Sequence, residues 1–111
     1  MKISEATEQI AVVEYCAMKN YTIFAIPNGG SRNKLEAANL KRQGVKAGVP
    51  DLFVPVAKKG YHGLFIEMKF GKNKTTANQD KWLSLLENNG YCTFVCYGFD
   101  SAVKALDWYF G

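Results

Sequence analysis

Four short runs rich in β-branched and aromatic residues, bounded by turn-forming residues, constrain the fold of this chain most strongly. Short runs of these residue types favour β-strands. Pro55, near the end of the second run, indicates an edge position or a bulge, because proline has no N–H to donate to a sheet ladder. The predicted strands are 21–26, 51–56, 63–69 and 91–97.

Around these runs, apolar residues recur with the period of an α-helix. The predicted helices are 4–19, with Ser4 as its N-cap, 76–88 and 99–110, while 31–43 forms a short basic helix or an ordered loop. This order predicts an α/β fold, with a central mixed β-sheet flanked by helices. A chain of 111 residues has the size of one domain, which would span 1–111.

The same periodicity predicts which helix faces are buried. The inward-facing sets are Ile10, Val13 and Ala17 in 4–19, and Trp82, Leu85 and Leu86 in 76–88. Three cysteines, Cys16, Cys92 and Cys96, lie in apolar stretches without a tight CxxC pair. We therefore expect them to be buried, reduced thiols and not a disulfide or zinc site.

The net charge of +4 and the pI of about 9.0 fit a polyanionic partner such as nucleic acid. No apolar run reaches the roughly 18 residues of a membrane span. The N-terminal MKISEATEQ has acidic residues where a signal peptide needs an apolar stretch. These features predict a cytoplasmic protein that does not contact a membrane.

A carboxylate and an ammonium group lie side by side at the end of the strand 63–69. Side chains alternate along a strand, so Glu67 and Lys69 share one face while Ile66 and Met68 face the core. A hairpin turn centred on Lys59 would pair residues whose numbers sum to 118. Asp51 would then lie opposite Glu67, with roughly 5 Å between the Cβ atoms.

Two directly opposed carboxylates are destabilising unless a positive charge compensates them. A divalent cation does so well, because oxygen ligands suit Mg²⁺. Lys69 could hold an attacking water or stabilise charge on a phosphate, so the group predicts a metal-assisted phosphodiesterase centre. The simpler alternative is a set of ordinary surface ion pairs.

The motifs that carry these residues are GVKAGVPDL at 44–52 and GLFIEMK at 63–69, followed by Gln79. In combination they resemble the virus-type replication-repair nuclease (VRR-NUC) domain, a branch of the PD-(D/E)XK nuclease superfamily. The resemblance runs from about Glu5 to the last helix. It implies a restriction-endonuclease-like core and a short, stand-alone domain of the type found in phages and prophages. The setting would be a bacterial cell or a phage-infected host.

The resemblance also implies roles for individual residues. Asp51, Glu67 and the backbone carbonyl of Met68 would bind Mg²⁺ or Mn²⁺, Lys69 would position the water, and Gln79 would lie near the site. An acidic residue on the first helix usually faces the metal as well. Glu5 and Glu8 both qualify, and Glu5 is preferred because it shares a face with Gln9. Both acids also fit a solvated first turn that is favoured by the helix dipole.

Basic and amide side chains on both sides of the motifs would contact DNA phosphates. They are Asn28, Arg32, Lys34, Lys41, Arg42, Lys46, Lys72 and Lys74. The resemblance further implies a homodimer that cuts branched DNA such as Holliday junctions, without a nucleotide cofactor. The apolar residues Trp108, Tyr109 and Phe110 could form the dimer interface.

Two other functions remain open at this level. One is a non-catalytic nucleic-acid-binding module that keeps only the nuclease fold. The other is a sequence-specific restriction endonuclease, although so short a chain has little room for an element that reads bases. The intact Asp51, Glu67 and Lys69 set favours a metal-dependent endonuclease acting on structured DNA.

Overall fold

The computed structural model describes residues 5–27 and 33–111, so the predicted Ser4 cap and the predicted DNA contacts Asn28 and Arg32 lie outside the described residues. The elements are α1 (Glu5–Lys19), β1 (Phe24–Ala25), α2 (Lys34–Arg42), β2 (Leu52–Val54), β3 (Leu64–Lys69), α3 (Ala77–Asn88), β4 (Cys92–Tyr97) and α4 (Phe99–Phe110). This order confirms the predicted α/β fold, with helices flanking a mixed sheet.

The four strands lie in the order β1-β2-β3-β4. β1 and β3 both pair antiparallel with β2, and β4 pairs parallel with β3 after the crossover through α3. All six residues of β3 are buried. This strand is therefore covered on both faces, and its two polar side chains cannot be solvated surface groups.

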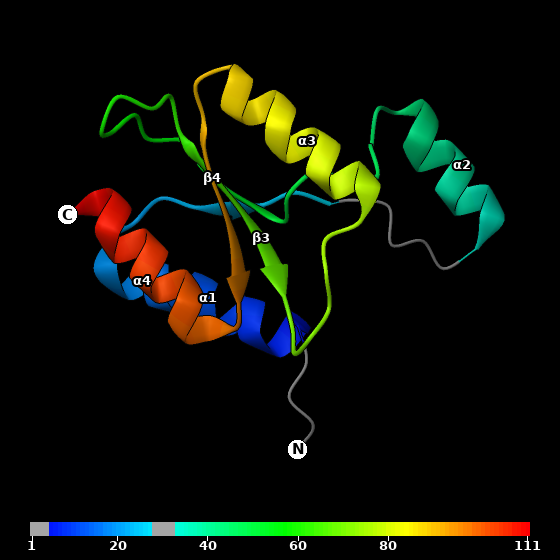
Figure 1. Cartoon of the computed structure of the whole chain (residues 1–111). Helices are drawn as coiled ribbons and strands as arrows, with labels where there is room; N and C mark the ends of the chain where they lie inside the picture. Colours follow the sequence, from blue (N-terminus) through cyan, green and yellow to red (C-terminus); the bar gives the residue numbers. More distant parts are fainter. Residues whose placement is uncertain (1–4, 28–32) are drawn as a thin grey trace.

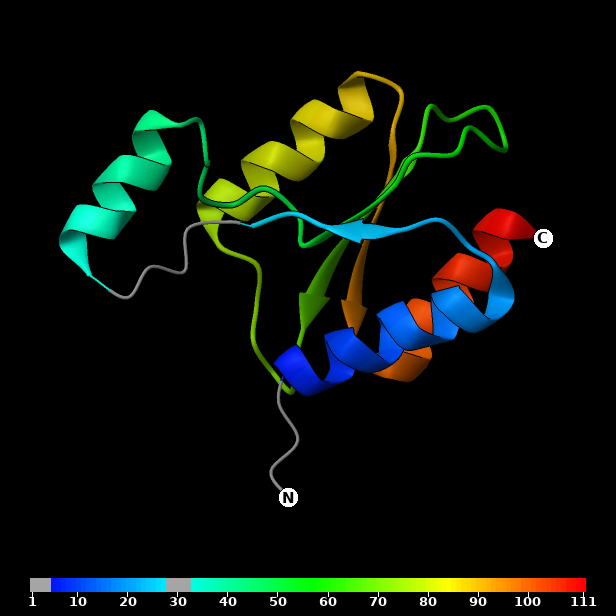
Figure 2. The ribbon, with the colours of Figure 1, turned by 180° about the vertical axis from the view of Figure 1, so that it is seen from behind.

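Helices lie on both sides of the sheet, as the two opposite views in Figure 1 and Figure 2 show. α1 and α4 lie together on one side, where Ile66 and Met68 of β3 join the main apolar core with Leu106 and Tyr109 of α4. α3 lies across the sheet from them (Figure 1). α2 contributes no buried residue and extends to the side of the molecule.

A tight turn joins β2 to β3, centred between Lys59 and Gly60 and not on Lys59 as predicted, and one extra residue next to it restores the predicted register of the strands. Lys59 and Gly60 have φ of 56° and 84°, so both central residues adopt the left-handed conformation of a type I′ hairpin turn. Lys58 and Tyr61 flank this turn, whereas Val54 pairs with Leu64. The segment 55–57 therefore has one residue more than its partner 62–63, which agrees with the bulge predicted at Pro55.

The buried face of α1 differs from the predicted one. Ile10 and Val13 are 60% and 38% exposed, and Val12 and Cys16 are fully buried instead. The cause is an anchor at Glu8, whose Oε2 accepts the N–H of Phe99 at 2.9 Å at the start of α4. Glu8, Val12 and Cys16 lie on one helix face, so this bond turns that face towards α4.

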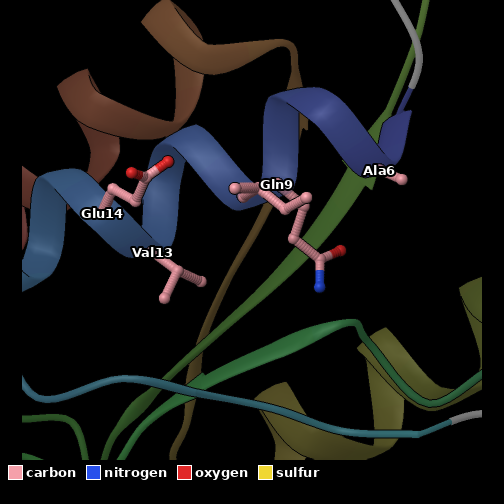
Figure 3. Close-up of a pocket in the computed structure, with 5 residues that line it drawn as sticks. Ala6, Gln9, Val13 and Glu14 are labelled. Carbon is pink, nitrogen blue, oxygen red and sulfur yellow. The ribbon is translucent and has the colours of Figure 1, made fainter.

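The side of α1 that was predicted to be buried instead borders a hollow. Figure 3 shows Gln9 and Val13 directed from α1 into it, with Ala6 and Glu14 at its ends. The hollow has a volume of about 340 Å³ and is lined by Ala6, Gln9, Ile10, Val13 and Glu14. The predicted apolar stripe is thus wrong in phase by about one residue.

Three other expectations change with packing. Leu85 was predicted to face inward but is 46% exposed, and Ala17 is exposed as well. The first strand is only Phe24–Ala25, because Tyr21 leaves the sheet to stack on Phe110 at 4.1 Å between ring centroids.

The C-terminal aromatic residues are largely used within the chain. Tyr109 is fully buried, and its hydroxyl donates to the Val56 carbonyl at 2.6 Å, which leaves Trp108, 48% exposed, for any external contact.

The three cysteines are free and buried, as predicted. Burial raises the pKa of the Cys16 and Cys96 thiols to about 11, so both stay protonated at neutral pH. Over the described ranges 5–27 and 33–111, no helix combines the length and apolar character that crossing a bilayer requires.

Candidate active site

Glu67 and Lys69 project from β3 on the face opposite to the α1 and α4 core. Lys69 Nζ lies 4.0 Å from Glu67 Oε2, and the two residues are only 7% and 2% exposed. Ile66 and Met68 point to the core from the alternate positions, as the sequence predicted. Burying a carboxylate is costly, so this position requires a partner that compensates its charge.

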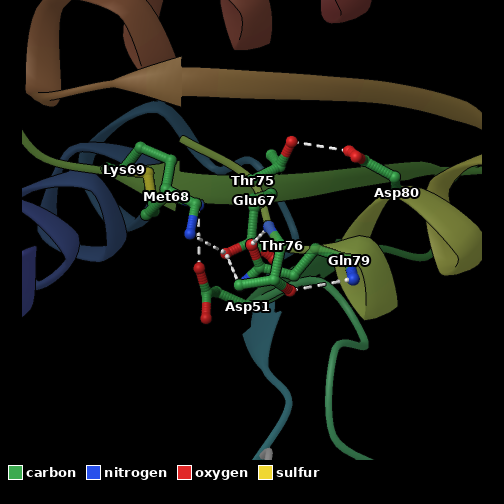
Figure 4. Close-up of polar contacts among 8 residues, drawn as sticks. All are labelled: Asp51, Glu67, Met68, Lys69, Thr75, Thr76, Gln79 and Asp80. Carbon is green, nitrogen blue, oxygen red and sulfur yellow. Dashed lines mark hydrogen bonds and ion pairs between the residues drawn. The ribbon is translucent and has the colours of Figure 1, made fainter. Parts of the chain in front are cut away.

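Asp51 lies beside this pair, directly before β2. Leu52 pairs with Ile66, so the predicted register, in which paired numbers sum to 118, is the observed one. It places Asp51 opposite Glu67. The Asp51 carbonyl accepts the N–H of Ile26, the residue directly after β1, at 2.8 Å, which holds the Asp51 backbone beside the end of that strand. Its side-chain Oδ2 accepts the Met68 N–H, also at 2.8 Å (Figure 4).

The surroundings of the Glu67 carboxyl group perturb its titration strongly. The pKa of Glu67 rises from 4.5 to about 8, chiefly through burial and then through the charge of the nearby Asp51 carboxylate. Lys69 lowers this pKa, and Glu5 raises it slightly. One ammonium group is therefore too little positive charge for the pair, which holds a proton at neutral pH unless a further cation replaces it.

Gln79 connects the site to the start of α3. Thr76 and Gln79 form a capping box: Thr76 Oγ1 accepts the Gln79 N–H at 3.2 Å, and Gln79 Oε1 accepts the Thr76 N–H at 2.8 Å. Gln79 Nε2 then donates to Glu67 Oε2 at 3.3 Å (Figure 4). The helix cap thus fixes the amide that orients the buried carboxylate.

One oxygen of this carboxylate has no such partner. Glu67 Oε1 is buried and has no hydrogen-bond partner among the described residues. A buried acceptor left unpaired is costly, and a charged one more so. A divalent cation would satisfy this oxygen and compensate Asp51 at the same time, so the residues present fit an oxygen-ligated Mg²⁺ or Mn²⁺.

The backbone supplies a further oxygen at this position. The N–H and C=O of one strand residue point to the same side, and the Met68 N–H points to Asp51. The register of β2 and β3, continued two residues beyond Leu52, places Pro50 opposite Met68, and Pro50 has no N–H to donate to the Met68 carbonyl. Proline before Asp51 therefore interrupts the ladder where the expected carbonyl ligand lies.

The family comparison agrees with this geometry. A family model of the VRR-NUC domain matches residues 3–100. The chain belongs to the VRR-NUC family. A solved structure described as a VRR_NUC domain protein is 32% identical, with a TM-score of 0.82, and the match covers 98% of this chain and 89% of that chain. No curated protein matches the chain. Membership in this family implies a nuclease-type function with nucleic acid as the substrate.

The two acids of α1 have different positions in the VRR-NUC domain. Glu8 is engaged at the N-terminus of α4, whereas Glu5 is near enough to raise the pKa of Glu67. Across 5–27 and 33–111, no three His, Cys, Asp or Glu side chains are grouped closely enough to hold one ion. Glu5 is thus the acid of α1 nearer to the site, but Asp51, Glu67 and Glu5 are not assembled as a three-carboxylate ligand set.

The predicted DNA contacts within the described residues are all exposed. Two belong to the segment between β3 and α3, and the others lie on α2 or directly after it. They are Lys72 and Lys74 in the first group, and Lys34, Lys41, Arg42 and Lys46 in the second. Along the chain, the second group precedes β2 and Asp51, and the first group follows β3 and Glu67.

Sequence reasoning missed two residues that shape this site. The T-x-x-Q spacing of Thr76 and Gln79 is the pattern of a capping box, and it is present in the sequence. It indicates that a helix cap fixes Gln79, whereas Gln79 is predicted as a site residue only from the family resemblance. Pro50 occurs in the sequence only as part of the 44–52 motif, and its missing N–H opposite Met68 gives it a second role. The strand register, once known, reveals the second role.

Proposed function

We propose that this VRR-NUC domain is a Mg²⁺- or Mn²⁺-dependent endonuclease that hydrolyses phosphodiester bonds in branched DNA, such as Holliday junctions. The observation that carries the proposal is the buried, unpaired Glu67 Oε1 beside Asp51. A purely structural carboxylate would be expected to have its hydrogen bonds satisfied. A carboxylate pair that needs a cation suits metal-assisted hydrolysis.

In this proposal Asp51, Glu67 and the Met68 carbonyl hold the ion. A bound divalent ion lowers the pKa of a coordinated water and neutralises charge that develops on the phosphate. Lys69, next to Glu67, holds the attacking water or a phosphate oxygen with its ammonium group. Gln79 keeps Glu67 in its orientation, and the Met68 N–H does the same for Asp51.

The substrate part of the proposal is supported by the positions of the basic groups. Exposed positive side chains in the segment before β2 and in the segment after β3 can neutralise phosphates of more than one DNA segment, as branched DNA presents them. We further propose that the chain acts as a homodimer, with each copy cutting one strand. Ile10, Met18 and Trp108 are large apolar residues that stay exposed and could contribute to that contact.

The test compares cleavage of a four-way junction with that of a linear duplex of the same sequence. We expect cutting of the junction with Mg²⁺ or Mn²⁺, little cutting of the duplex, and none with EDTA. Cleavage of the duplex at one defined sequence would instead indicate a restriction endonuclease. Binding without cleavage under all metal conditions would indicate a non-catalytic module and contradict the proposal.

The basic groups of α2 allow a separate prediction of how DNA binding depends on salt concentration. Binding of the junction should weaken steeply as salt rises, because each neutralised phosphate releases counterions. Replacing Lys41 and Arg42 by Gln should reduce the slope of log K against log salt by roughly 2, about one for each lost contact. Fluorescence anisotropy in EDTA measures this slope, and Lys104→Gln, an exposed lysine of α4, is the control. An unchanged slope would exclude α2 from the DNA interface.

A further inference from the structure

A cavity of about 430 Å³ lies between α3 and the segment that joins α2 to β2. Trp82, Leu86 and Phe65 contribute its aromatic and aliphatic surface, and Val45 closes it from the joining segment. Gln43 and Lys46 provide the polar groups that border it. Its volume is in the range of sites for flat organic ligands.

This cavity lies next to the carboxylate pair, because residues close to Glu67 on β3 and close to Asp51 before β2 both line it. Phe65 precedes Glu67 by two positions on the same face of β3, a separation of roughly 7 Å along the strand. Val49, which also lines the cavity, precedes Asp51 by two positions. When a phosphodiester is held at Asp51 and Glu67, the base of a neighbouring nucleotide can therefore reach the cavity.

The wall of the cavity is held in place by a close backbone contact. Gly48 has φ of +92°, and a Cβ at this position would lie 2.8 Å from the Asn78 carbonyl carbon. No other residue type fits there, so the joining segment packs directly on α3. Asn78 and Trp82 are four residues apart on one face of α3. The contact between Gly48 and Asn78 thus positions the Trp82 indole, and it also fixes the chain segment that leads to Asp51.

We infer that this cavity is a subsite for one unstacked nucleobase next to the scissile phosphate, with Trp82 as the stacking surface. The inference rests on the proposed nuclease function. Trp82 is only half-buried and the lining is mostly apolar, which suits a flat, uncharged heterocycle and not a phosphate. The Gln43 amide can hydrogen-bond to a base edge, and Lys46 can contact the phosphate that follows. Branch points supply unstacked bases, which links this subsite to the proposed substrate.

Trp82 fluorescence tests this subsite without any cleavage. The chain has two tryptophans, so Trp108→Phe leaves Trp82 as the single reporter. The probe is a four-way junction in EDTA, unmodified or with one abasic nucleotide at each position near the crossover in turn. We expect the unmodified junction to quench Trp82, and one abasic position to abolish this quenching.

Affinity provides the second measurement, in otherwise wild-type protein. Trp82→Leu keeps an apolar side chain but removes the stacking surface, and should weaken binding of the unmodified junction by about 5- to 150-fold. The same substitution should have little effect on the junction with the critical abasic nucleotide, and Trp82→Phe should retain most of the affinity. Tyr61→Leu is the matched control, since Tyr61 is an exposed aromatic residue beside the β2–β3 turn, and should bind like the wild type.

Unchanged Trp82 fluorescence on DNA binding would overturn the subsite, and so would an equal effect of Trp82→Leu on unmodified and abasic DNA. Circular dichroism and thermal unfolding separate these results from a failure of Trp82→Leu to fold. Failure of the proposed nuclease function has a different signature, because it removes cleavage with every metal while quenching and affinity persist.

Discussion

Proteins carrying Asp51→Asn or Lys69→Met are expected to bind a four-way junction as the wild type does but to cut it at least about 10²-fold more slowly. Asn keeps the shape of Asp51 and can still accept the Met68 N–H, but it lacks the charge that a divalent ion needs. Met keeps most of the buried aliphatic volume of Lys69 and removes the ammonium group beside Glu67.

Initial rates at saturating Mn²⁺ and binding in EDTA measure the two effects separately. Asp100→Asn and Lys81→Met are matched controls, because they make the same chemical changes at exposed positions of α4 and α3. The controls should cut at the wild-type rate. Cleavage by Asp51→Asn at a control-like rate would exclude metal binding at this pair, and a loss of cooperative unfolding would show that the residue is structural.

The position of the carboxylate pair, Asp51 and Glu67, could be predicted because it depends on local rules. Strand alternation alone places Glu67 and Lys69 on one face. The short turn at Lys59 and Gly60, together with the extra residue in 55–57, sets the register that brings Asp51 opposite Glu67. Neither step requires knowledge of how the layers pack. The element order followed for the same reason, since each strand and helix has a clear pattern of its own.

The buried face of α1 could not be predicted in this way. Apolar residues occupy positions 10–13 and 16–18, so two neighbouring stripes have the spacing of a helix face. Periodicity gives the spacing of a stripe but not which of the two is chosen. The choice is made by Glu8, which binds the Phe99 N–H 91 positions away and turns Val12 and Cys16 inward.

Trp82 illustrates a second limit. Its spacing to Leu86 on α3 predicts a core residue, yet the joining segment that packs on Asn78 through Gly48 leaves the indole bordering a cavity. Close approach of two segments distant in sequence depends on the sizes of all residues between them. Sequence patterns indicate whether a residue tends to be buried. They do not indicate which gaps remain between segments after packing.

The raised pKa of Glu67 predicts an unusual dependence of stability on pH. The pKa is 4.5 in the unfolded chain and about 8 in the folded one, so the folded state binds more protons between these values. The free energy of unfolding contributed by Glu67 is therefore fully present below pH 4.5 and is lost as pH rises towards 8. At 1.36 kcal/mol per pKa unit, the loss is about 5 kcal/mol.

Glu67→Gln should remove this loss, because the amide has nearly the same shape and no charge to desolvate. Urea unfolding in EDTA should give similar stabilities for both proteins at pH 5 and a more stable variant at pH 8, by several kcal/mol. Groups that titrate elsewhere are shared by the two proteins, so the difference between the curves isolates position 67.

Adding Mg²⁺ at pH 8 should stabilise the wild type, since an ion bound only by the folded state shifts the equilibrium by mass action, and should leave Glu67→Gln nearly unchanged. Parallel pH curves would mean that the carboxyl group is not desolvated in the folded chain, and the argument for a cation at Asp51 and Glu67 would lose its main support.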